Sequence, residues 1–460
     1  MPVNSFEDYP MTWKPVLNRA DKPIYRALAG QLERDIREGR LLPGTKLPPQ
    51  RELADFLDVN LSTISKAFKV AELKGLLSAT VGSGTYVSFD AISNAYLLEE
   101  QKPESLIEMG AILPDSVSYR PLRDLMQSML QEDDYAKWFG YSRPGDSLWQ
   151  KDAAVRLMKR AGVRTSREHI LFSAGAQNAI ASALASLCRH GDRIGVDHHT
   201  YPGLKTAAAM LGIQLVPIRS ETDEMSPEAV LYACKNENIK GLYLIPDCQN
   251  PMTYTMSLES RRAIARIVQA HDLFMIEDGT YHLIGETRLP AIAAYAPEHT
   301  IYIAGLSKVI APGLRLAYLS VPLKFLDLIR KALYNINISV SPLLAELTAR
   351  IIVSNQFEQV LALHREEAKA RNRLIDRYLG RENCLGEPEG IFRWLRLPER
   401  YTGDRFEQIA AAQGVQVYGG GRFVVGSTAP ANAVRLAVCS PESRESLEQG
   451  LIVLKKMLDE

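Results

Sequence analysis

Short apolar runs alternate with helical stretches along most of this 460-residue chain, and that alternation limits the fold more than any other feature. Helical patterns lie between the runs, notably at 177–189 and 257–271. Six runs have the length of buried strands, namely HILFS (169–173), RIGVD (193–197), QLVPI (214–218), GLYLIP (241–246), LFMIED (273–278) and TIYIAG (300–305). This order favours an α/β domain with a mainly parallel central sheet.

We place this α/β domain at residues 106–460. Its large subdomain is expected over about 150–340, where the six runs lie. The last stretch, about 350–460, mixes long helices with short strands and predicts a smaller subdomain.

The first part of the chain is organised differently. Residues 23–39 carry an apolar stripe at four-residue spacing, which indicates an amphipathic helix. After Pro-Gly and Pro-Pro turns, a short helix begins near residue 50, and Asn60 can cap a third helix that ends at Gly75. Two β-type runs around Gly82-Ser83-Gly84 then predict a hairpin. The sequence therefore predicts an α/β winged helix-turn-helix at 15–88, followed by an acidic, weakly patterned linker at 89–105.

A winged helix-turn-helix places the N-terminal end of its third helix in the major groove. Short hydroxyl side chains at that end can face base edges, while a basic side chain or the wing can contact phosphates. The predicted DNA contacts are Arg51, Ser62, Thr63, Ser65, Lys66 and Gly84. The predicted partner is a double-stranded operator, and the alternative is a three-helix module that binds another protein.

Composition limits the other possibilities. The chain is 46% hydrophobic and 23% charged, as is ordinary for a globular protein, and its formal net charge is zero. Residues 15–88 carry 11 Lys and Arg against 8 Asp and Glu, a local excess of three positive charges. Binding of a polyanion is therefore expected from this module and not from the chain as a whole.

The five cysteines are scattered and never form a C-x-x-C pair. That spacing argues against a disulfide framework and against a zinc site, and we expect no bound metal. The N-terminus MPVNSFEDYPMTWKP has no apolar core of a signal peptide, and no stretch has the length of a membrane span. We therefore expect a cytoplasmic location.

Polar or aromatic residues follow the predicted strands. Ligands bind at the carboxyl ends of the strands in such sheets. Small residues and then a helix follow the first run, so the backbone N–H groups of Gly175, Ala176 and Gln177 form a natural phosphate site. After the later runs come Tyr201, Asn250 before a proline whose peptide bond could be cis, Asp278 with Tyr281, and finally Lys308 with Arg315.

One ligand, pyridoxal 5′-phosphate, accounts for this set. It needs a lysine to form an imine with its aldehyde, a carboxylate to keep its ring nitrogen protonated, and a phosphate site. Lys308, Asp278 and the Gly175 loop with Arg315 match these needs. Asn250 or Tyr281 can donate to the phenolate oxygen, and Tyr201 can stack on the ring. Separately, each residue also fits a structural role, such as a turn, a helix cap or a core aromatic.

Both parts of the chain resemble known families. The stretch from PIYRALAGQ to GSGTYV is similar to the DNA-binding domain of GntR regulators, although Asn60-Leu61 stands where family members often carry Ser-Arg. Residues 106–460 resemble the fold-type I aminotransferases. That resemblance implies the same cofactor roles and adds phosphate contacts from Ser307 and from Tyr141 of a neighbouring subunit, hence a homodimer. It also implies that Arg435 binds a substrate or effector carboxylate; the alternative is a structural ion pair.

Two positions depart from the aminotransferase pattern. Gly305 replaces a frequent phosphate-binding Ser or Thr, and NPMTYT replaces the usual Asn-Pro-Thr-Gly. A GntR-type module joined to an aminotransferase-like domain resembles the MocR regulators, in which the large domain senses an amine or amino-acid effector. Two alternatives stay open: an active aminotransferase with an added DNA-binding domain, and a regulator that no longer binds the cofactor.

Overall fold

The computed structural model describes most of the chain, with gaps. The described residues are 11–16, 23–37, 40–41, 44–80, 84–88, 106–114, 119–141, 148–221, 224–285, 289–426 and 428–460. The predicted linker at 89–105 and the turn residues Gly82 and Ser83 lie outside them.

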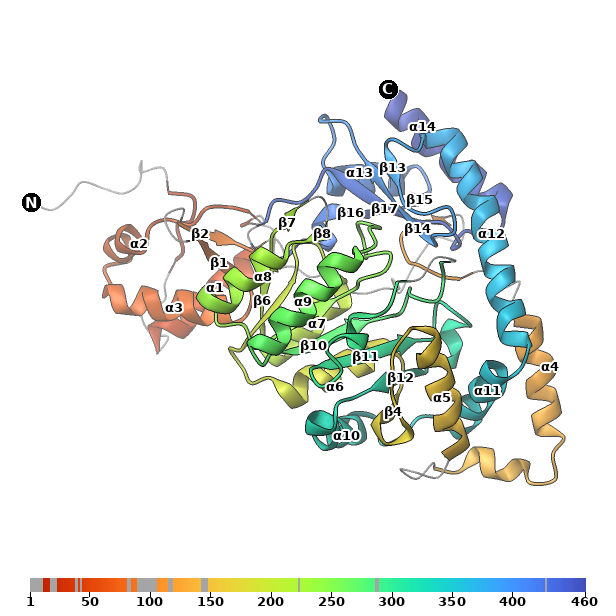
Figure 1. Cartoon of the computed structure of the whole chain (residues 1–460). Helices are drawn as coiled ribbons and strands as arrows, with labels where there is room; N and C mark the ends of the chain where they lie inside the picture. The colour runs from red at the N-terminus through yellow and green to blue at the C-terminus, as the bar shows by residue number, and fades with distance from the viewer. Residues whose placement is uncertain are drawn as a thin grey trace, which may run out of the picture.

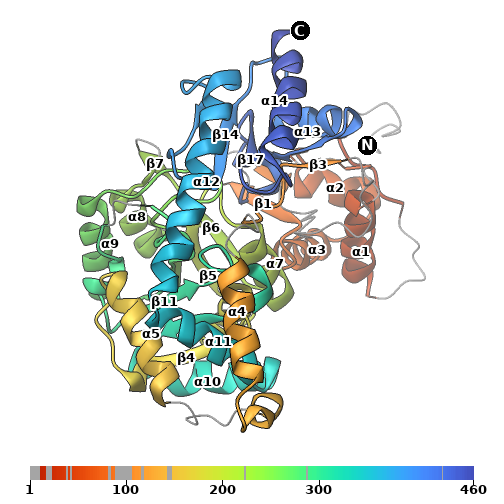
Figure 2. The same cartoon turned by 90° about the vertical axis from the view of Figure 1, so that its right-hand side faces the viewer.

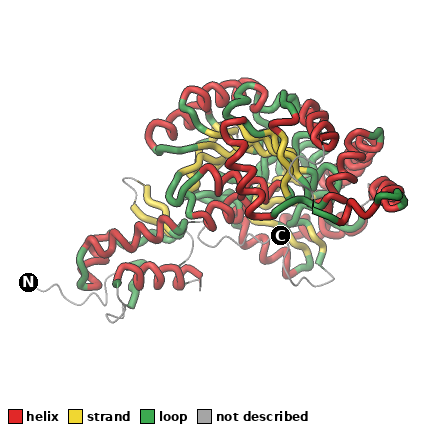
Figure 3. Tube along the Cα trace, turned by 90° about the horizontal axis from the view of Figure 1, so that it is seen from below, coloured by secondary structure: helices red, strands yellow, loops and turns green. Residues whose placement is uncertain are grey.

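The N-terminal module contains three helices and a hairpin (Figure 3). The elements are α1 (Ile24–Arg37), α2 (Gln50–Leu57), α3 (Leu61–Leu73), β1 (Leu77–Thr80) and β2 (Gly84–Val87). β1 and β2 pair antiparallel, and the Asn60 side chain accepts a hydrogen bond from the Ser62 N–H at 2.9 Å, as an N-cap does. The helix order and the hairpin are those of a winged helix-turn-helix, as the sequence predicted.

One apolar core holds this module together. Leu28, Leu32 and Ile36 of the predicted α1 stripe are buried against Phe68 of α3 and Val87 of β2. The stripe's spacing places these side chains on one face of α1. Packing α3 against α1, α2 and β1 leaves the opposite face of α3 in solvent.

A seven-stranded sheet forms the centre of the large domain (Figure 1). Its order is β4-β12-β11-β10-β9-β5-β6. The strands are β4 (Ile170–Ser173), β5 (Arg193–Asp197), β6 (Gln214–Ile218), β9 (Gly241–Leu244), β10 (Phe274–Asp278), β11 (Thr300–Gly305) and β12 (Ala317–Ser320). All six predicted runs are strands, and the mainly parallel sheet is confirmed.

The sequence analysis missed β12. This four-residue strand lies between β4 and β11 and runs antiparallel to both. It follows a Pro-Gly turn after Lys308 so closely that its local pattern looks like the end of a loop. The strand brings Arg315, just before it, beside the loop that follows β4.

Helices cover both faces of the sheet (Figures 1 and 2). Alternate side chains of β11 point to opposite faces of the sheet. Ile301 and Ile303 pack with the helices on one face, and Tyr302 and Ala304 pack with those on the other. The first side carries α6 (Ala176–Leu187), α7 (Pro202–Leu211) and α10 (Leu323–Asn337). The second side carries α5 (Leu148–Arg160), α8 (Pro227–Asn236), α9 (Leu258–Ala270) and α11 (Pro342–Val353).

The C-terminal part forms a second, antiparallel sheet, with the chain's C-terminus at the top of Figures 1 and 2. Its strand order is β13-β14-β17-β16. The elements here are α12 (Gln356–Leu379), β13 (Cys384–Leu385), β14 (Phe392–Arg396), α13 (Gly403–Ala412), β15 (Val415–Gln416), β16 (Tyr418–Gly419), β17 (Ala433–Ala437) and α14 (Arg444–Asp459).

The segment just before the large subdomain joins this second sheet region. β3 (Ile107–Glu108) pairs parallel with β15, which lies far along the chain. Glu108 also accepts the backbone N–H groups of Gly110 and Ala111 at 2.7 and 2.8 Å. These contacts bring residues 107–112 between the two sheets. The remaining elements are α4 (Tyr119–Leu130) and the hairpin β7 (Ser220–Glu221) and β8 (Glu224–Met225). Among the described helices, none is both long and apolar enough to cross a bilayer.

Candidate functional site

The carboxyl ends of the parallel strands meet at one edge of the central sheet. Asp278 is the last residue of β10, and Lys308 follows β11 by three residues. β10 and β11 are adjacent and parallel. Asn250 follows β9, Tyr201 follows β5 and Gly175 follows β4. The fold thus gathers the residues that the sequence predicted as ligands of one site.

Lys308 is the primary amine of this site. Its side chain is half-buried, and Nζ donates a hydrogen bond to the backbone oxygen of Ile112, in the segment beside β3. Burial, with the positive charges of Arg435 and Arg315, lowers the pKa of Lys308 to about 8. The amine therefore loses its proton more easily near neutral pH than an exposed lysine does, as a nucleophile requires.

Asp278 is a buried carboxylate with three donors. The Tyr243 hydroxyl donates to Oδ2 at 2.9 Å, while the Thr280 backbone N–H and hydroxyl donate to Oδ1 at 3.1 and 2.6 Å. Burial raises the pKa of Asp278, and these hydrogen bonds offset part of that rise. The sequence analysis missed Tyr243 and Thr280. Tyr243 stands inside an apolar strand, and only its partner across the sheet shows what its hydroxyl does.

Thr280 also explains the glycine at position 305. A Cβ added to Gly305 would overlap the Thr280 hydroxyl oxygen. The space that a serine or threonine would take at position 305 is thus filled by a side chain from the β10 end. Gly305 therefore follows from local packing and does not by itself indicate that a cofactor site has been lost.

Two tyrosines and an asparagine surround the same space. Tyr201 precedes α7, and burial raises the pKa of its hydroxyl to about 12, with a smaller contribution from the Asp278 charge. A side chain at Gly203 would overlap the Tyr201 ring. Tyr281 is buried and meets Phe392 edge to face, with ring centroids 5.2 Å apart. The Asn250–Pro251 peptide bond is cis.

The loop after β4 faces Arg315. Gly175 has φ of 88°, in the left-handed region, and a Cβ there would lie 2.9 Å from Arg315 Nη2. Arg315 Nη2 donates to the Ala174 oxygen at 3.3 Å. The Gly175 N–H already donates to the Ser173 oxygen at 2.8 Å, so the backbone donors open to an anion are those of Ala176 and Gln177 in the first turn of α6.

The side chain of Gln177 is not oriented to donate a hydrogen bond to a phosphate. Its amide Nε2 donates to the Gly203 oxygen at 2.8 Å, and its Oε1 is buried without a partner among the described residues. An oxygen acceptor repels a phosphate. The Gln177 backbone N–H, and not its side chain, is therefore the group that fits the predicted contact.

Arg435 projects from β17 into the same region. Its guanidinium donates to Asn250 Oδ1 at 2.7 Å and to the Gly110 oxygen at 2.6 Å. It lies near three aromatic rings, with centroid distances of 5.9 Å to Phe392, 5.4 Å to Tyr418 and 4.8 Å to Phe423. Burial lowers the pKa of Arg435 to about 10.

No described carboxylate forms an ion pair with Arg435, and its buried Nε has no partner among the described residues. The described residues therefore do not support the alternative that Arg435 forms a structural ion pair. A buried cation without a counter-charge is costly. An anionic ligand would reduce that cost, because it would supply the charge that the protein itself does not place there.

Two predicted residues show less contact with the site. Ser307 is half-buried in the loop that carries Lys308. Tyr141 is 83% exposed, and no described hydrogen bond or ring contact links it to the residues around Lys308. A tyrosine that serves a neighbouring subunit would be exposed in a single chain.

A seam joins the two sheets beside the site. The Thr200 N–H donates to the Phe423 oxygen at 2.8 Å, and the Val425 N–H donates to the His198 oxygen at 3.0 Å. His199 is buried in this seam, where Nε2 accepts the Ala431 N–H at 3.2 Å. These bonds link the segment just before Tyr201 to the segment that leads into β17, the strand of Arg435.

The predicted DNA-binding face of α3 is largely exposed. Ser62, Ser65 and Lys66 are exposed, Thr63 is half-buried, and Arg51 is exposed on α2. The Ser65 hydroxyl donates to Gln50 Oε1 at 2.7 Å, so Gln50 of α2 belongs to this face, although the sequence analysis missed it. Gly84 has φ of 117°, and a Cβ there would lie 2.9 Å from Cε of Lys46. Lys46, also missed, adds a positive charge at the base of the wing.

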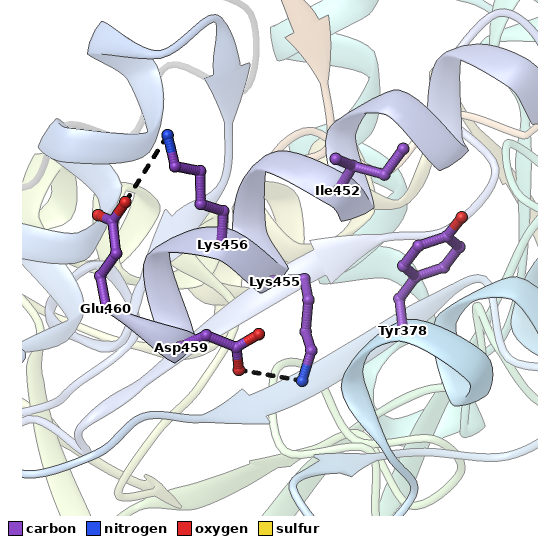
Figure 4. Close-up of a pocket in the computed structure, with 6 residues that line it drawn as sticks. All are labelled: Tyr378, Ile452, Lys455, Lys456, Asp459 and Glu460. Atoms are coloured by element: carbon purple, nitrogen blue, oxygen red, sulfur yellow. Dashed lines mark ion pairs between the residues drawn. The ribbon is translucent and has the colours of Figure 1, made fainter.

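At least two surface grooves of the described residues lie apart from the predicted site. One groove lies between α12 and α14, beside the C-terminus (Figure 4). Lys455 pairs with Asp459 at 3.0 Å and Lys456 with Glu460 at 3.7 Å, so its charges are balanced along one helix. None of the predicted site residues lines it.

Comparison with known proteins agrees with both halves of the structure. Residues 24–87 match the family of bacterial regulatory proteins, gntR family, and residues 110–451 match aminotransferase class I and II. The HTH-type transcriptional regulator YdeF of Bacillus subtilis (strain 168), itself uncharacterized, is 65% identical over 460 residues, with both chains covered in full. The probable rhizopine catabolism regulatory protein MocR of Rhizobium meliloti is 25% identical over 438 residues, covering 87% of this chain and 86% of MocR.

Solved structures agree with the fold of the large domain. An archaeal alanine:glyoxylate aminotransferase superposes with a TM-score of 0.71 at 23% identity, covering 77% of this chain and 91% of that one. The α-aminoadipate aminotransferase LysN of Thermus thermophilus, solved with N-(5′-phosphopyridoxyl)-L-leucine, gives 0.68 at 23% identity, covering 77% of this chain and 92% of that one.

A winged helix-turn-helix joined to a fold-type I aminotransferase domain defines a class of transcription regulators. The predicted fold and the predicted regulatory class are therefore confirmed. Since a full-length relative is an HTH-type regulator and MocR matches over most of its length, the chain belongs to the MocR-type regulators, with a gntR-family module and a domain of the aminotransferase class I and II family.

Proposed function

We propose that this regulator binds pyridoxal 5′-phosphate through Lys308 and senses an effector that carries an amine and a carboxylate. The observation that carries the proposal is the pairing of Asp278 and Lys308 at the ends of adjacent strands, beside the Gly175 loop and Arg315. When bound, the cofactor supplies an aldehyde that condenses reversibly with a primary amine.

The residues of this chain would divide the binding between them. Asp278 would hold the proton on the pyridine nitrogen, and Arg315 with the backbone N–H groups of Ala176 and Gln177 would hold the phosphate. Asn250 Oδ1 accepts a hydrogen bond from Arg435, so the Asn250 Nδ2 group is left as the donor for the phenolate oxygen. Tyr281 is the second phenolate donor, and the Tyr201 ring is the surface for stacking.

Arg435 would bind the effector carboxylate. Its guanidinium is buried, is surrounded by aromatic rings and has an unpartnered Nε among the described residues. A carboxylate arriving there replaces neutral acceptors with a charged one, and charge-assisted hydrogen bonds are about twice as strong as neutral ones. Effector binding would thus draw together β17 and the Lys308 loop, which belong to different sheets.

The regulator would act as a homodimer on a paired operator site. α10 exposes five large apolar residues, Leu323, Leu328, Tyr334, Ile336 and, at its end, Ile338. Exposed large apolar residues gathered on one helix are typical of a surface that another chain covers. Tyr141, exposed just after the short 3-10 helix Tyr135–Phe139, would reach the phosphate of the partner's site.

Absorption spectroscopy tests the cofactor part. We expect a visible band when pyridoxal 5′-phosphate is added to the wild-type protein and no such band for Lys308→Ala. Lys235→Ala, at an exposed lysine of α8, is the matched control and should keep the band. Identical spectra for the wild type and Lys308→Ala would refute the role of Lys308, while the DNA-binding assignment would stand.

A second candidate function is turnover as an aminotransferase. Lys308, Asp278 and Arg435 form a complete set for that chemistry, and their common position at the sheet edge, with Asp278 and Arg435 buried and Lys308 half-buried, supports this candidate. A steady-state assay with pairs of amino acids and 2-oxo acids separates the two functions. Sustained turnover at ordinary enzyme rates would favour catalysis, whereas effector-dependent DNA binding without turnover would favour sensing.

A further inference from the structure

The N-terminal end of α3 presents an apolar side chain to solvent. Leu61 is the first residue of α3 and is 40% exposed. Among the residues from 23 to 88 whose side chains the structure describes, it is the only large apolar one that is exposed. The other leucines and the phenylalanines of this module whose side chains the structure describes pack into one core or at its margins. Leu61 is therefore the large apolar side chain of this part of the module that is open to contact with a partner.

Helix geometry places Leu61 at the edge of the DNA-facing surface. The buried side of α3 is formed by Ile64, Ala67, Phe68 and Ala71. Leu61 lies one turn before Ser65, and residues four apart are neighbours on a helix surface. Ser65 is exposed and bonded to Gln50 of α2. The leucine thus lies beside the Ser65–Gln50 pair and next to exposed Ser62.

We propose that Leu61 reads a thymine in the operator by packing on its 5-methyl group. The proposal rests on the DNA-binding role of the winged module. In the major groove, thymine is the one base of the four that presents an apolar group, while the others present only hydrogen-bond donors and acceptors. Leucine can make no hydrogen bond. Against a guanine or cytosine edge it would leave polar groups desolvated and unpaired, which costs free energy.

Removal of that methyl group is the direct test, because deoxyuridine differs from thymidine in the methyl alone. Binding sites would first be selected from random duplex DNA with the full-length protein. Each thymidine of the selected half-site would then be replaced by deoxyuridine. For wild type we expect one position where the replacement weakens binding about fourfold, from the roughly 0.8 kcal/mol that a buried methyl-sized group contributes.

The same series with Leu61→Ala assigns the effect to the residue. We expect Leu61→Ala to bind the thymidine and deoxyuridine duplexes equally at that position. Lys66→Ala is the contrasting variant: it should weaken binding to all sequences alike, as loss of a phosphate contact does, and keep the fourfold deoxyuridine effect. Thermal melting of each variant checks that the module is folded.

Two results would overturn the proposal. One is a wild-type protein that is indifferent to deoxyuridine at every position of its site. The other is a deoxyuridine effect that persists unchanged in Leu61→Ala. A full-length protein that binds no duplex at all gives a different outcome, because it would refute the DNA-binding role itself, and the reading by Leu61 with it.

Discussion

Lys308 is expected to lower the stability of the cofactor-free protein, so Lys308→Met should be more stable than wild type at neutral pH. The pKa of this amine falls from an ordinary 10.5 to about 8 in the folded chain. At about 1.4 kcal/mol per pKa unit, this shift corresponds to at most about 3.5 kcal/mol. Solvent reaches the half-buried side chain, and the hydrogen bond to the Ile112 oxygen is lost in the variant. We therefore expect a net gain of about 1–2 kcal/mol.

The pH dependence gives the sign of this effect. Below about pH 8 the amine is protonated in both states, and the folded state carries the full cost of a buried cation. Between about pH 8 and the ordinary pKa the unfolded chain binds more protons than the folded chain, so wild-type stability rises with pH. The advantage of Lys308→Met should therefore be largest near pH 7 and should shrink as the pH approaches 10.5.

Calorimetric melting of the full-length, cofactor-free protein measures this difference. At roughly 2 cal/mol/K of unfolding entropy per residue, 1–2 kcal/mol in a domain of this size is about 1–3 °C. Lys235→Met, at an exposed lysine of α8, should show no such gain. A Lys308→Met protein that melts at or below wild type near pH 7, or a gap that does not narrow toward about pH 9.5, would refute the reasoning.

Three further predictions concern buried groups near the site. Gly305→Ser should destabilise the protein by about 1–3 kcal/mol in urea unfolding, because the new side chain overlaps Thr280, and adding Thr280→Ala should recover part of the loss. Tyr243→Phe should cost about 1–2 kcal/mol, and more at the alkaline end of a pH series than at the acid end, since its hydroxyl stabilises the ionised form of Asp278. A cost that does not change with pH would contradict this. Burial lowers the pKa of His199 from 6.5 to about 3, so wild-type stability should fall as the pH drops from about 6.5 toward 3. In melting curves, His199→Gln should reduce that loss of stability, whereas His271→Gln, at an exposed histidine, should not.

Much of the site could be predicted from the sequence because parallel strands bring their carboxyl ends to one edge. Once the apolar runs were recognised, Tyr201, Asn250, Asp278 and Lys308 had to lie near one another. The cap at Asn60 and the order of helices and hairpin likewise follow from local patterns. Where the pattern was too short, as in β12, the prediction failed.

Several groups at the site have no local signature. The oxygens of Gly110 and Ile112 contact Arg435 and Lys308, but any residue has a backbone oxygen, and only the pairing of β3 with β15 places these two there. The Tyr243 hydroxyl reaches Asp278 across the sheet, and Gln50 reaches Ser65 between two helices. The Gly175 N–H donates within its own turn, and that use is equally hidden because every non-proline residue has a backbone N–H.

The sequence by itself determined the two modules, the direction of the central strands and the residue types at their ends, because hydrophobic periodicity and caps act within a few residues. Only the tertiary structure decided which donors and acceptors remain open to a ligand. That outcome depends on contacts between segments far apart in the chain, such as Arg435 with Asn250, and these contacts form only when the two sheets pack together.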